Sequence, residues 1–249
     1  MFPYLRLGPL LVQLPGLALL VGVWVGSLLA EREAHRLKGV AADIYNLIFI
    51  GLASGIVGAR LTYAARYLGV YLANPLSLFA LNGNTLAVSD GLIIGMAAAA
   101  LYIWRKKLPV RSTLDALAPG FAVFMVFLGV GHILSGDAFG ASSHLPWSIY
   151  LWGEYRHPSQ FYEVMAGLVT LAVILRRPLE TAGQGLNFLL AIALSAAARI
   201  LLEAFRGDSL IWGGGFRAAQ VLGLIVLIAA LWLMRRWIQP DDKILTERR

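Results

Sequence analysis

Long apolar runs fill most of this chain, and they constrain its fold more than any other feature. Seven of them are long enough, or nearly so, to cross ~30 Å of hydrocarbon as helices that rise about 1.5 Å per residue. The fifth is short, and its helix is expected to begin nearer His157. The predicted spans are Leu10–Ala30, Ala42–Tyr63, Ala87–Trp104, Leu114–Leu134, Phe161–Leu175, Leu186–Phe205 and Ala218–Trp237. We therefore predict an all-α polytopic membrane protein with about seven transmembrane helices.

Composition supports this fold class and excludes several kinds of site. Only 14% of the residues are charged, compared with about 25% in soluble domains. The net charge of +7 comes from short basic clusters between apolar runs, so nucleic-acid binding is not predicted. The absence of cysteine excludes disulfides and thiolate metal sites, and the sequence predicts neither a metal site nor a cofactor. No polar linker divides the chain, so residues 1–249 are expected to form a single transmembrane domain.

The distribution of Lys and Arg predicts the orientation in the membrane. Basic clusters follow the first, third, fifth and seventh runs, whereas the alternate connections hold few basic residues. By the positive-inside rule the N-terminus is outside and the tail, residues 238–249, is cytoplasmic. Residues 66–89 and 137–156 then lie on the outer side. The first is expected to be a re-entrant or interfacial segment, and the second an amphipathic element at the interface.

Ionisable side chains inside the apolar runs are costly in a membrane, so each marks a candidate site. Arg199, Glu203 and Arg206 lie near the outer end of the sixth run, and their spacing places them on one helical stripe. Glu203 can neutralise one arginine, which leaves surplus positive charge for a phosphate. A structural ion-pair network is the alternative. Arg60, at a similar outer depth in the second run, could instead snorkel to the interface.

A second polar cluster begins the fifth span. Pro158 suits the first turn of a helix, where its missing N–H is not needed. Gln160 and Glu163 follow three residues apart, on a face that enters the membrane. His157, at the boundary, could serve as a general base or as an interfacial cap residue.

A third cluster closes the fourth span. Its glycines favour close helix packing or the approach of backbone to a ligand. Asp137 is expected at the outer interface, with His132 about one and a half turns deeper.

These clusters resemble the motifs of the bacterial prolipoprotein diacylglyceryl transferases. Residues 156–163 read RHPSQFYE, which closely resembles a signature of that family. Residues 199–206, RILLEAFR, are similar to its motif R-x-x-x-E-x-x-R, and residues 58–63, GARLTY, are similar to G-x-R-x-x-Y. The resemblance implies a protein of the bacterial cytoplasmic membrane. It also implies transfer of a diacylglyceryl group from phosphatidylglycerol, an anionic phospholipid, to the lipobox cysteine of a secreted lipoprotein precursor.

The resemblance further implies roles for individual residues. Arg199 and Arg206 would hold the phosphate as charge develops on the leaving group, with Glu203 between them. His132 or His157 would take the proton of the thiol. Side chains expected to bind the lipid substrate are Arg60, Asp137, Gln160, Tyr162 and Glu163. We also expect Arg60 and Glu163 to converge with the two arginines on a lipid-accessible cavity.

Several positions depart from the family pattern. The motif G-R-x-G-N falls on residues 128–132, so its arginine is Gly129 and its asparagine is His132. A histidine expected near the start of the third helix falls on Ser89, or on Asp90 if the gap moves, and a tyrosine of the first helix falls on Pro15. Two hypotheses follow: an active transferase, or a catalytically silent relative that binds phospholipid or a lipoprotein. A transporter is disfavoured because the sequence contains no inverted repeat.

Overall fold

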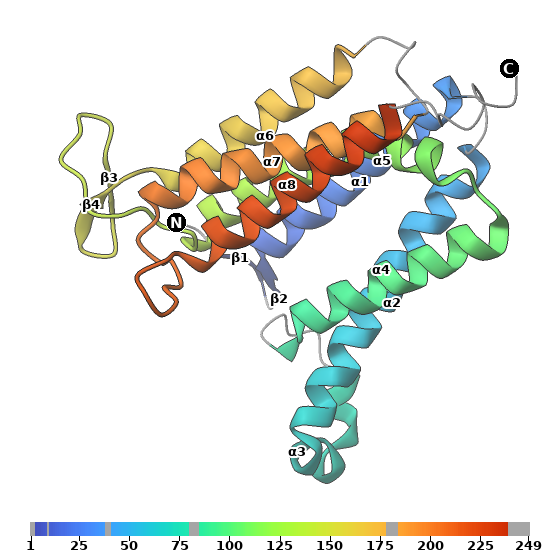
Figure 1. Ribbon diagram of the computed structural model, residues 1–249. Helices are drawn as coiled ribbons and strands as arrows, with labels where there is room; N and C mark the ends of the chain where they lie inside the picture. Colours follow the sequence, from blue (N-terminus) through green and yellow to red (C-terminus); the bar gives the residue numbers. More distant parts are fainter. Residues whose placement is uncertain (1–2, 9, 38–40, 80–84, 178–183, 239–249) are drawn as a thin grey trace, which may run out of the picture.

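The computed structural model describes residues 3–8, 10–37, 41–79, 85–177 and 184–238, which are mainly helical (Figure 1). Six of the helices are long and apolar enough to cross a membrane, and α6 is a shorter apolar helix. This confirms the predicted all-α polytopic class. The helices are α1 (Leu14–Arg36), α2 (Ala41–Arg66), α3 (Leu68–Ala73), α4 (Val88–Lys106), α5 (Val110–Ser135), α6 (Ser159–Leu175), α7 (Leu186–Leu202) and α8 (Ala218–Ile238), with the 3₁₀ helices η1 (Pro75–Phe79) and η4 (Glu203–Phe205).

Every predicted span coincides with a helix, and the differences lie at the ends. Helix α1 begins at Leu14 rather than Leu10, because Pro15 suits the first helical turn and residues 10–13 pair as a strand. Helix α6 begins at Ser159, directly after Pro158, as its composition indicated. Helix α7 continues into η4, so Glu203 lies in a tighter final turn.

Two short hairpins occur on segments for which the sequence predicted no strands. Strand β1 (Tyr4–Leu7) pairs antiparallel with β2 (Leu10–Gln13), and β3 (Ile149–Leu151) pairs with β4 (Glu154–Arg156). Trp152 and Gly153 connect β3 to β4, and both have positive φ, as a tight two-residue hairpin turn requires. The outer element predicted at 137–156 is therefore partly a β-hairpin.

The segment predicted to be re-entrant or interfacial contains α3 and η1. Neither element has a buried residue, and their hydrophobic side chains are exposed. Exposed apolar side chains on a short helix suit contact with lipid, and whether this segment is re-entrant or interfacial stays a prediction. Residues 80–84 of this segment lie outside the described residues.

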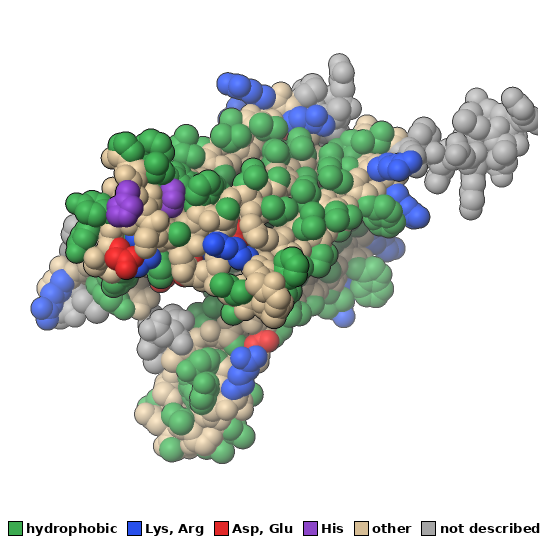
Figure 2. Space-filling view, turned by 60° about the vertical axis from the view of Figure 1, so that its left-hand side comes forward, with side chains coloured by type: hydrophobic (Ala, Val, Ile, Leu, Met, Phe, Trp, Pro, Cys, Tyr) green, Lys and Arg blue, Asp and Glu red, His purple; other side chains and the backbone are tan. Residues whose placement is uncertain are grey.

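Helices α1, α5, α6, α7 and α8 run side by side, whereas α2 and α4 form an arm that diverges from them (Figure 1). Close approach of small residues holds α1 against α5. A Cβ atom at Gly26 would lie 2.9 Å from the carbonyl oxygen of Gly120, so the two backbones nearly touch. Hydrophobic side chains cover most of the helical surface in Figure 2, as expected where lipid replaces water.

A cavity of about 560 Å³ lies between the arm and the bundle. Its walls come mainly from α1, α2, α4 and α5, and they are almost entirely apolar. Glycine and alanine line much of it, including Gly55, Gly95 and Ala30, which leaves room for long flexible groups between the helices.

Candidate functional site

Glu163, in the first turns of α6, lies at the centre of a group of charged side chains. Its Oε1 accepts hydrogen bonds from Arg206 at 2.8 Å and from Arg199 at 3.3 Å. Its Oε2 lies 2.6 Å from Nδ1 of His132, on α5. The predicted convergence of Arg199, Arg206 and Glu163 is therefore observed, and it brings together three segments far apart in sequence.

Two further carboxylates face the same arginines. Glu203 is only 1% exposed, and its Oε2 lies 3.2 Å from Arg199 Nη2 and 3.9 Å from Arg206 Nε. Asp208 accepts from Nε and Nη2 of Arg206 at 2.9 and 2.8 Å, a forked ion pair. We refer to His132, Glu163, Arg199, Glu203, Arg206 and Asp208 as the Glu163 cluster.

The two arginines of the cluster differ in how fully they are engaged. Three carboxylates face two guanidinium groups, so the predicted surplus of positive charge is not found. Burial alone would lower the pKa of Arg206, but the hydrogen bond to Asp208 and the charge of Glu163 outweigh it and raise that pKa, so Arg206 stays charged. Its side chain is 10% exposed, whereas that of Arg199 is 40% exposed. Arg199 is the arginine that a ligand can reach.

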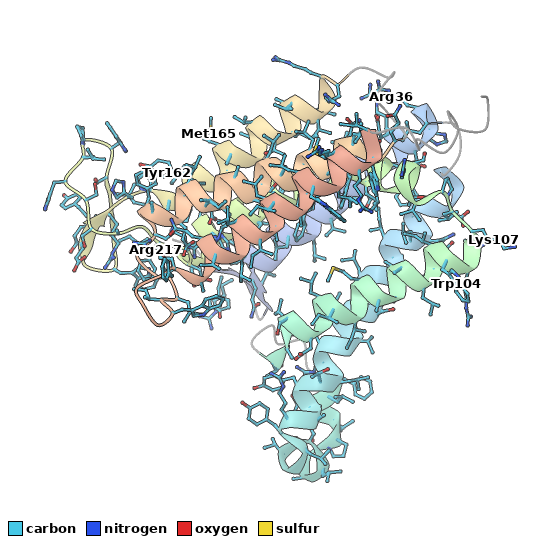
Figure 3. All side chains as sticks on the ribbon, viewed as in Figure 1. Arg36, Trp104, Lys107, Tyr162, Met165 and Arg217 are labelled. Atoms are coloured by element: carbon cyan, nitrogen blue, oxygen red, sulfur yellow. The ribbon has the colours of Figure 1, made fainter. Side chains whose placement is uncertain are left out.

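The connecting segments next to Arg206 are fixed by backbone hydrogen bonds. The N–H of Ala141 donates to the carbonyl of Phe205 at 2.8 Å, and the N–H of His157 donates to the carbonyl of Ala141 at 2.9 Å. Arg217 donates to the carbonyls of Glu203 and Arg206 and so ties down the loop that follows η4. Figure 3 shows Tyr162 and Arg217 at the same end of the molecule, opposite Arg36 and Lys107.

Sequence reasoning did not single out Arg217 or Asp208. The sequence did contain a signal for Arg217. Basic residues are sparse in the connections predicted to be outside, so each one there is a candidate for a structural or functional role. Asp208 carried no comparable signal, since a single acidic residue in a polar loop is unremarkable in a sequence.

A small cavity of about 90 Å³ lies where α5, α6 and α7 meet. His132, Glu163 and Arg199 line it together with Gly129 and several apolar residues. A basic ring, a carboxylate and a partly exposed guanidinium therefore share one cavity in an apolar environment, where electrostatic interactions are stronger than in water.

His157 lies outside this cavity wall, in the packed outer segments. Its ring packs against those of Phe205 and Tyr162, with centroids 5.2 and 6.4 Å away. Its Nδ1 is buried and has no hydrogen-bond partner in the described part of the chain. Among the described residues, no carboxylate makes a hydrogen bond to this ring.

The other predicted ligand residues of this region hold the outer segments together. Gln160 is fully buried, and its Nε2 donates to the backbone carbonyl of Asp137 at 3.0 Å. The hydroxyl of Tyr162 accepts a hydrogen bond from Trp147 Nε1 at 2.9 Å. Asp137 itself is exposed at the outer end of α5.

Arg60 does not join the Glu163 cluster, so its predicted convergence there is wrong. Its Nε donates to the carbonyl of Leu78 at 2.9 Å and its Nη2 to that of Ser77 at 2.6 Å. Its Nη1 donates to both the carbonyl and the hydroxyl of Thr85. The guanidinium ties α2 to the segment before α4, since all its hydrogen bonds within the described residues go to the arm. An arginine at outer depth looked like a ligand group because the sequence does not reveal which carbonyls surround it.

Comparison with known proteins decides the family. Residues 3–236 match the family model for prolipoprotein diacylglyceryl transferase. The chain belongs to this family. The phosphatidylglycerol–prolipoprotein diacylglyceryl transferase of Lactobacillus gasseri is 30% identical over 247 residues, which cover 93% of this chain and 89% of the relative. The enzyme of the same name from Clostridioides difficile is 29% identical over 218 residues, 87% of each chain.

Family membership confirms the resemblance found from the motifs, and with it the prediction of a transferase in a membrane. The family motifs at 156–163 and 199–206 supply most of the Glu163 cluster. The two residues of α5 that depart from the family motif, Gly129 and His132, also lie at this cluster. His132 contacts Glu163 directly, and Gly129 lines the cavity beside it. The altered residues therefore bear on the site itself.

Proposed function

We propose that this protein transfers a diacylglyceryl group from phosphatidylglycerol to the cysteine thiol of a secreted lipoprotein precursor. The observation that carries the proposal is the shared cavity of Arg199, Glu163 and His132. In the reaction the cysteine sulfur attacks the glyceryl carbon that bears the phosphate ester. A carbon–sulfur bond forms, the carbon–oxygen bond breaks, and glycerol phosphate leaves with the electron pair.

Arg199 is the residue that holds the phosphate. Its Nη1 and Nη2 face Glu163 and Glu203, whereas its Nε makes no hydrogen bond within the described residues. A guanidinium placed beside the scissile ester stabilises the negative charge that grows on the leaving phosphate. Arg206 acts differently, because Asp208 and Glu163 engage it fully. It positions Glu163. Either His132 or His157 accepts the thiol proton.

The fold offers places for the rest of the donor lipid. The apolar cavity of about 560 Å³ suits acyl chains, because its walls are hydrophobic and small residues leave space between the helices. Gln160 and Tyr162 hold the outer segments above the site, and Arg60 holds the arm. Asp137 lies exposed at the outer surface, where it can meet the head group or the precursor.

Replacing Arg199 with alanine is expected to lower transfer about 10²- to 10³-fold, the usual loss when one group that stabilises developing negative charge is removed. Lysine is expected to restore only part of the rate, because it offers a point charge in place of a fork. The measurement is lipidation of a cysteine-containing lipobox peptide by protein reconstituted in phosphatidylglycerol vesicles. Arg66→Ala is the control, since Arg66 makes an exposed ion pair with Asp90 on the arm.

The same assay tests the second candidate function. If wild-type protein binds phosphatidylglycerol in detergent micelles but lipidates no peptide, the protein is the catalytically silent relative. The observation that favours this second candidate is that Gly129 and His132 depart from the family motif.

We further propose one transmembrane domain in the bacterial cytoplasmic membrane, with the N-terminus outside and the tail inside. The alternating basic clusters support this orientation. The chain has no cysteine, so single cysteines at Ser142 and Lys243 can be labelled without background. A membrane-impermeant maleimide added to intact spheroplasts is expected to label Ser142→Cys only. Labelling of Lys243→Cys alone, or of both variants, would contradict the orientation.

A further inference from the structure

His132 and Glu163 form a close pair whose geometry fixes the tautomer of the histidine ring. Nδ1 of His132 lies 2.6 Å from Glu163 Oε2, while the other carboxylate oxygen accepts from Arg199 and Arg206. Glu163 accepts hydrogen bonds from both guanidinium groups, and with the carboxylate as acceptor here too, Nδ1 is the donor of this hydrogen bond. In the neutral ring Nε2 then carries the lone pair, and it makes no hydrogen bond within the described residues.

This arrangement has the parts that a general base requires. The ring lines the same cavity as Arg199, so a thiol beside His132 would lie near the guanidinium that holds the phosphate. A carboxylate on the far nitrogen orients the ring and stabilises the cation that forms when Nε2 takes a proton. His157 lacks these parts, because its Nδ1 is buried without a partner and its ring packs between aromatic side chains.

The charged groups near His132 come from the helices that pack against α5. Helix α6 presents Glu163, and α7 with the following turn and loop presents the other charged members of the Glu163 cluster. Helix α1, which packs along α5, has no ionisable residue between Leu14 and Ala30. The immediate partner of the ring is therefore the carboxylate of Glu163.

We propose that His132, oriented by Glu163, is the base that removes the thiol proton in the transfer reaction; this inference rests on the proposed function. The thiol proton passes to Nε2 as the sulfur attacks the glyceryl carbon and the phosphate ester bond breaks. The proton then leaves His132 to the released glycerol phosphate or to water, which returns the ring to its neutral form. The base is thus supplied at the position where the family motif has an asparagine.

The test compares wild type, His132→Asn and His157→Asn by peptide lipidation in phosphatidylglycerol vesicles between pH 5.5 and 9.5. The wild-type rate is expected to rise with pH, as it does for a reaction that needs an unprotonated base. His132→Asn is expected to lose at least ~10²-fold in rate near neutral pH and to lose this rise. Part of the rate should return above about pH 8.5, where a cysteine thiol ionises unaided. Added imidazole should also restore part of it.

Binding of phosphatidylglycerol separates a base from a structural residue. In detergent micelles His132→Asn is expected to bind added phosphatidylglycerol as wild type does, and His157→Asn is expected to keep the wild-type pH profile. The inference is overturned if His132→Asn keeps rate and profile, or if its rate falls only as far as its lipid binding. Absence of transfer by wild type would overturn both the inference and the proposed function, whereas an active His132→Asn would overturn the inference alone.

Discussion

Gly129→Arg is expected to abolish transfer and to destabilise the protein, although it restores the arginine of the family motif. A Cβ atom at Gly129 would lie 2.8 Å from Val164 Cγ2 and 3.0 Å from its backbone nitrogen. No side chain fits between α5 and α6 at this distance without a shift of α6. Even alanine is expected to cost about 1–3 kcal/mol through overpacking, and arginine considerably more.

The control for this prediction is Gly131, which lies two residues further along α5. A Cβ atom at Gly131 would have its nearest neighbour at 3.7 Å, an ordinary contact, so Gly131→Ala is expected to keep both stability and activity. Thermal unfolding in detergent and peptide lipidation are the measurements. Full activity in Gly129→Arg would show that α5 and α6 separate at this point and that the contact with Val164 is not needed.

The packing at Gly129 also changes what a double variant can achieve. Changing Gly129 and His132 together to arginine and asparagine would recreate the family motif on paper. Because a Cβ atom at position 129 already meets Val164 and the backbone of α6, the pair is expected to remain inactive. Restoring a motif residue requires the surrounding shell that accommodates it.

The sequence predicted the spans well because a helix in lipid must satisfy its own backbone and cover itself with apolar side chains. That constraint is local, and it is visible in any window of residues. The stripe of Arg199, Glu203 and Arg206 was predictable for the same reason, since helical spacing is local too. The β3–β4 hairpin escaped prediction because its aromatic residues resemble an amphipathic interfacial element in composition, and β2 was included in the first span because residues 10–13 are mostly apolar.

The remaining errors concern distances between segments. Asp208 occupies two donors of Arg206, and carbonyls of the arm occupy Arg60. Neither partner could be read from the spacing along one helix. The net charge of the Glu163 cluster was therefore predicted with the wrong sign. The sequence suggested surplus positive charge, whereas the structure places three carboxylates around two guanidinium groups.

Glu163→Gln is expected to separate lipid binding from transfer. The substitution keeps the shape of the side chain but removes the charge that pairs with Arg199, Arg206 and His132. Hydrogen bonds to charged groups contribute about 1.5–3 kcal/mol, so a loss of stability in this range is expected. Transfer is expected to fall at least ~10²-fold, because His132 loses the carboxylate that orients it.

Binding of anionic lipid should respond in the opposite direction. In Glu163→Gln two carboxylates, Glu203 and Asp208, face two guanidinium groups, so the cluster repels a phosphate less than the wild-type cluster does. The variant is therefore expected to bind phosphatidylglycerol, added to the protein in detergent micelles, more tightly than wild type while it lipidates peptide more slowly. Asp90→Asn, which removes an exposed ion pair on the arm, is expected to change neither quantity. Weaker lipid binding by Glu163→Gln would instead mean that Glu163 holds Arg199 in the position that binds phosphate, and that its charge helps binding more than it opposes it.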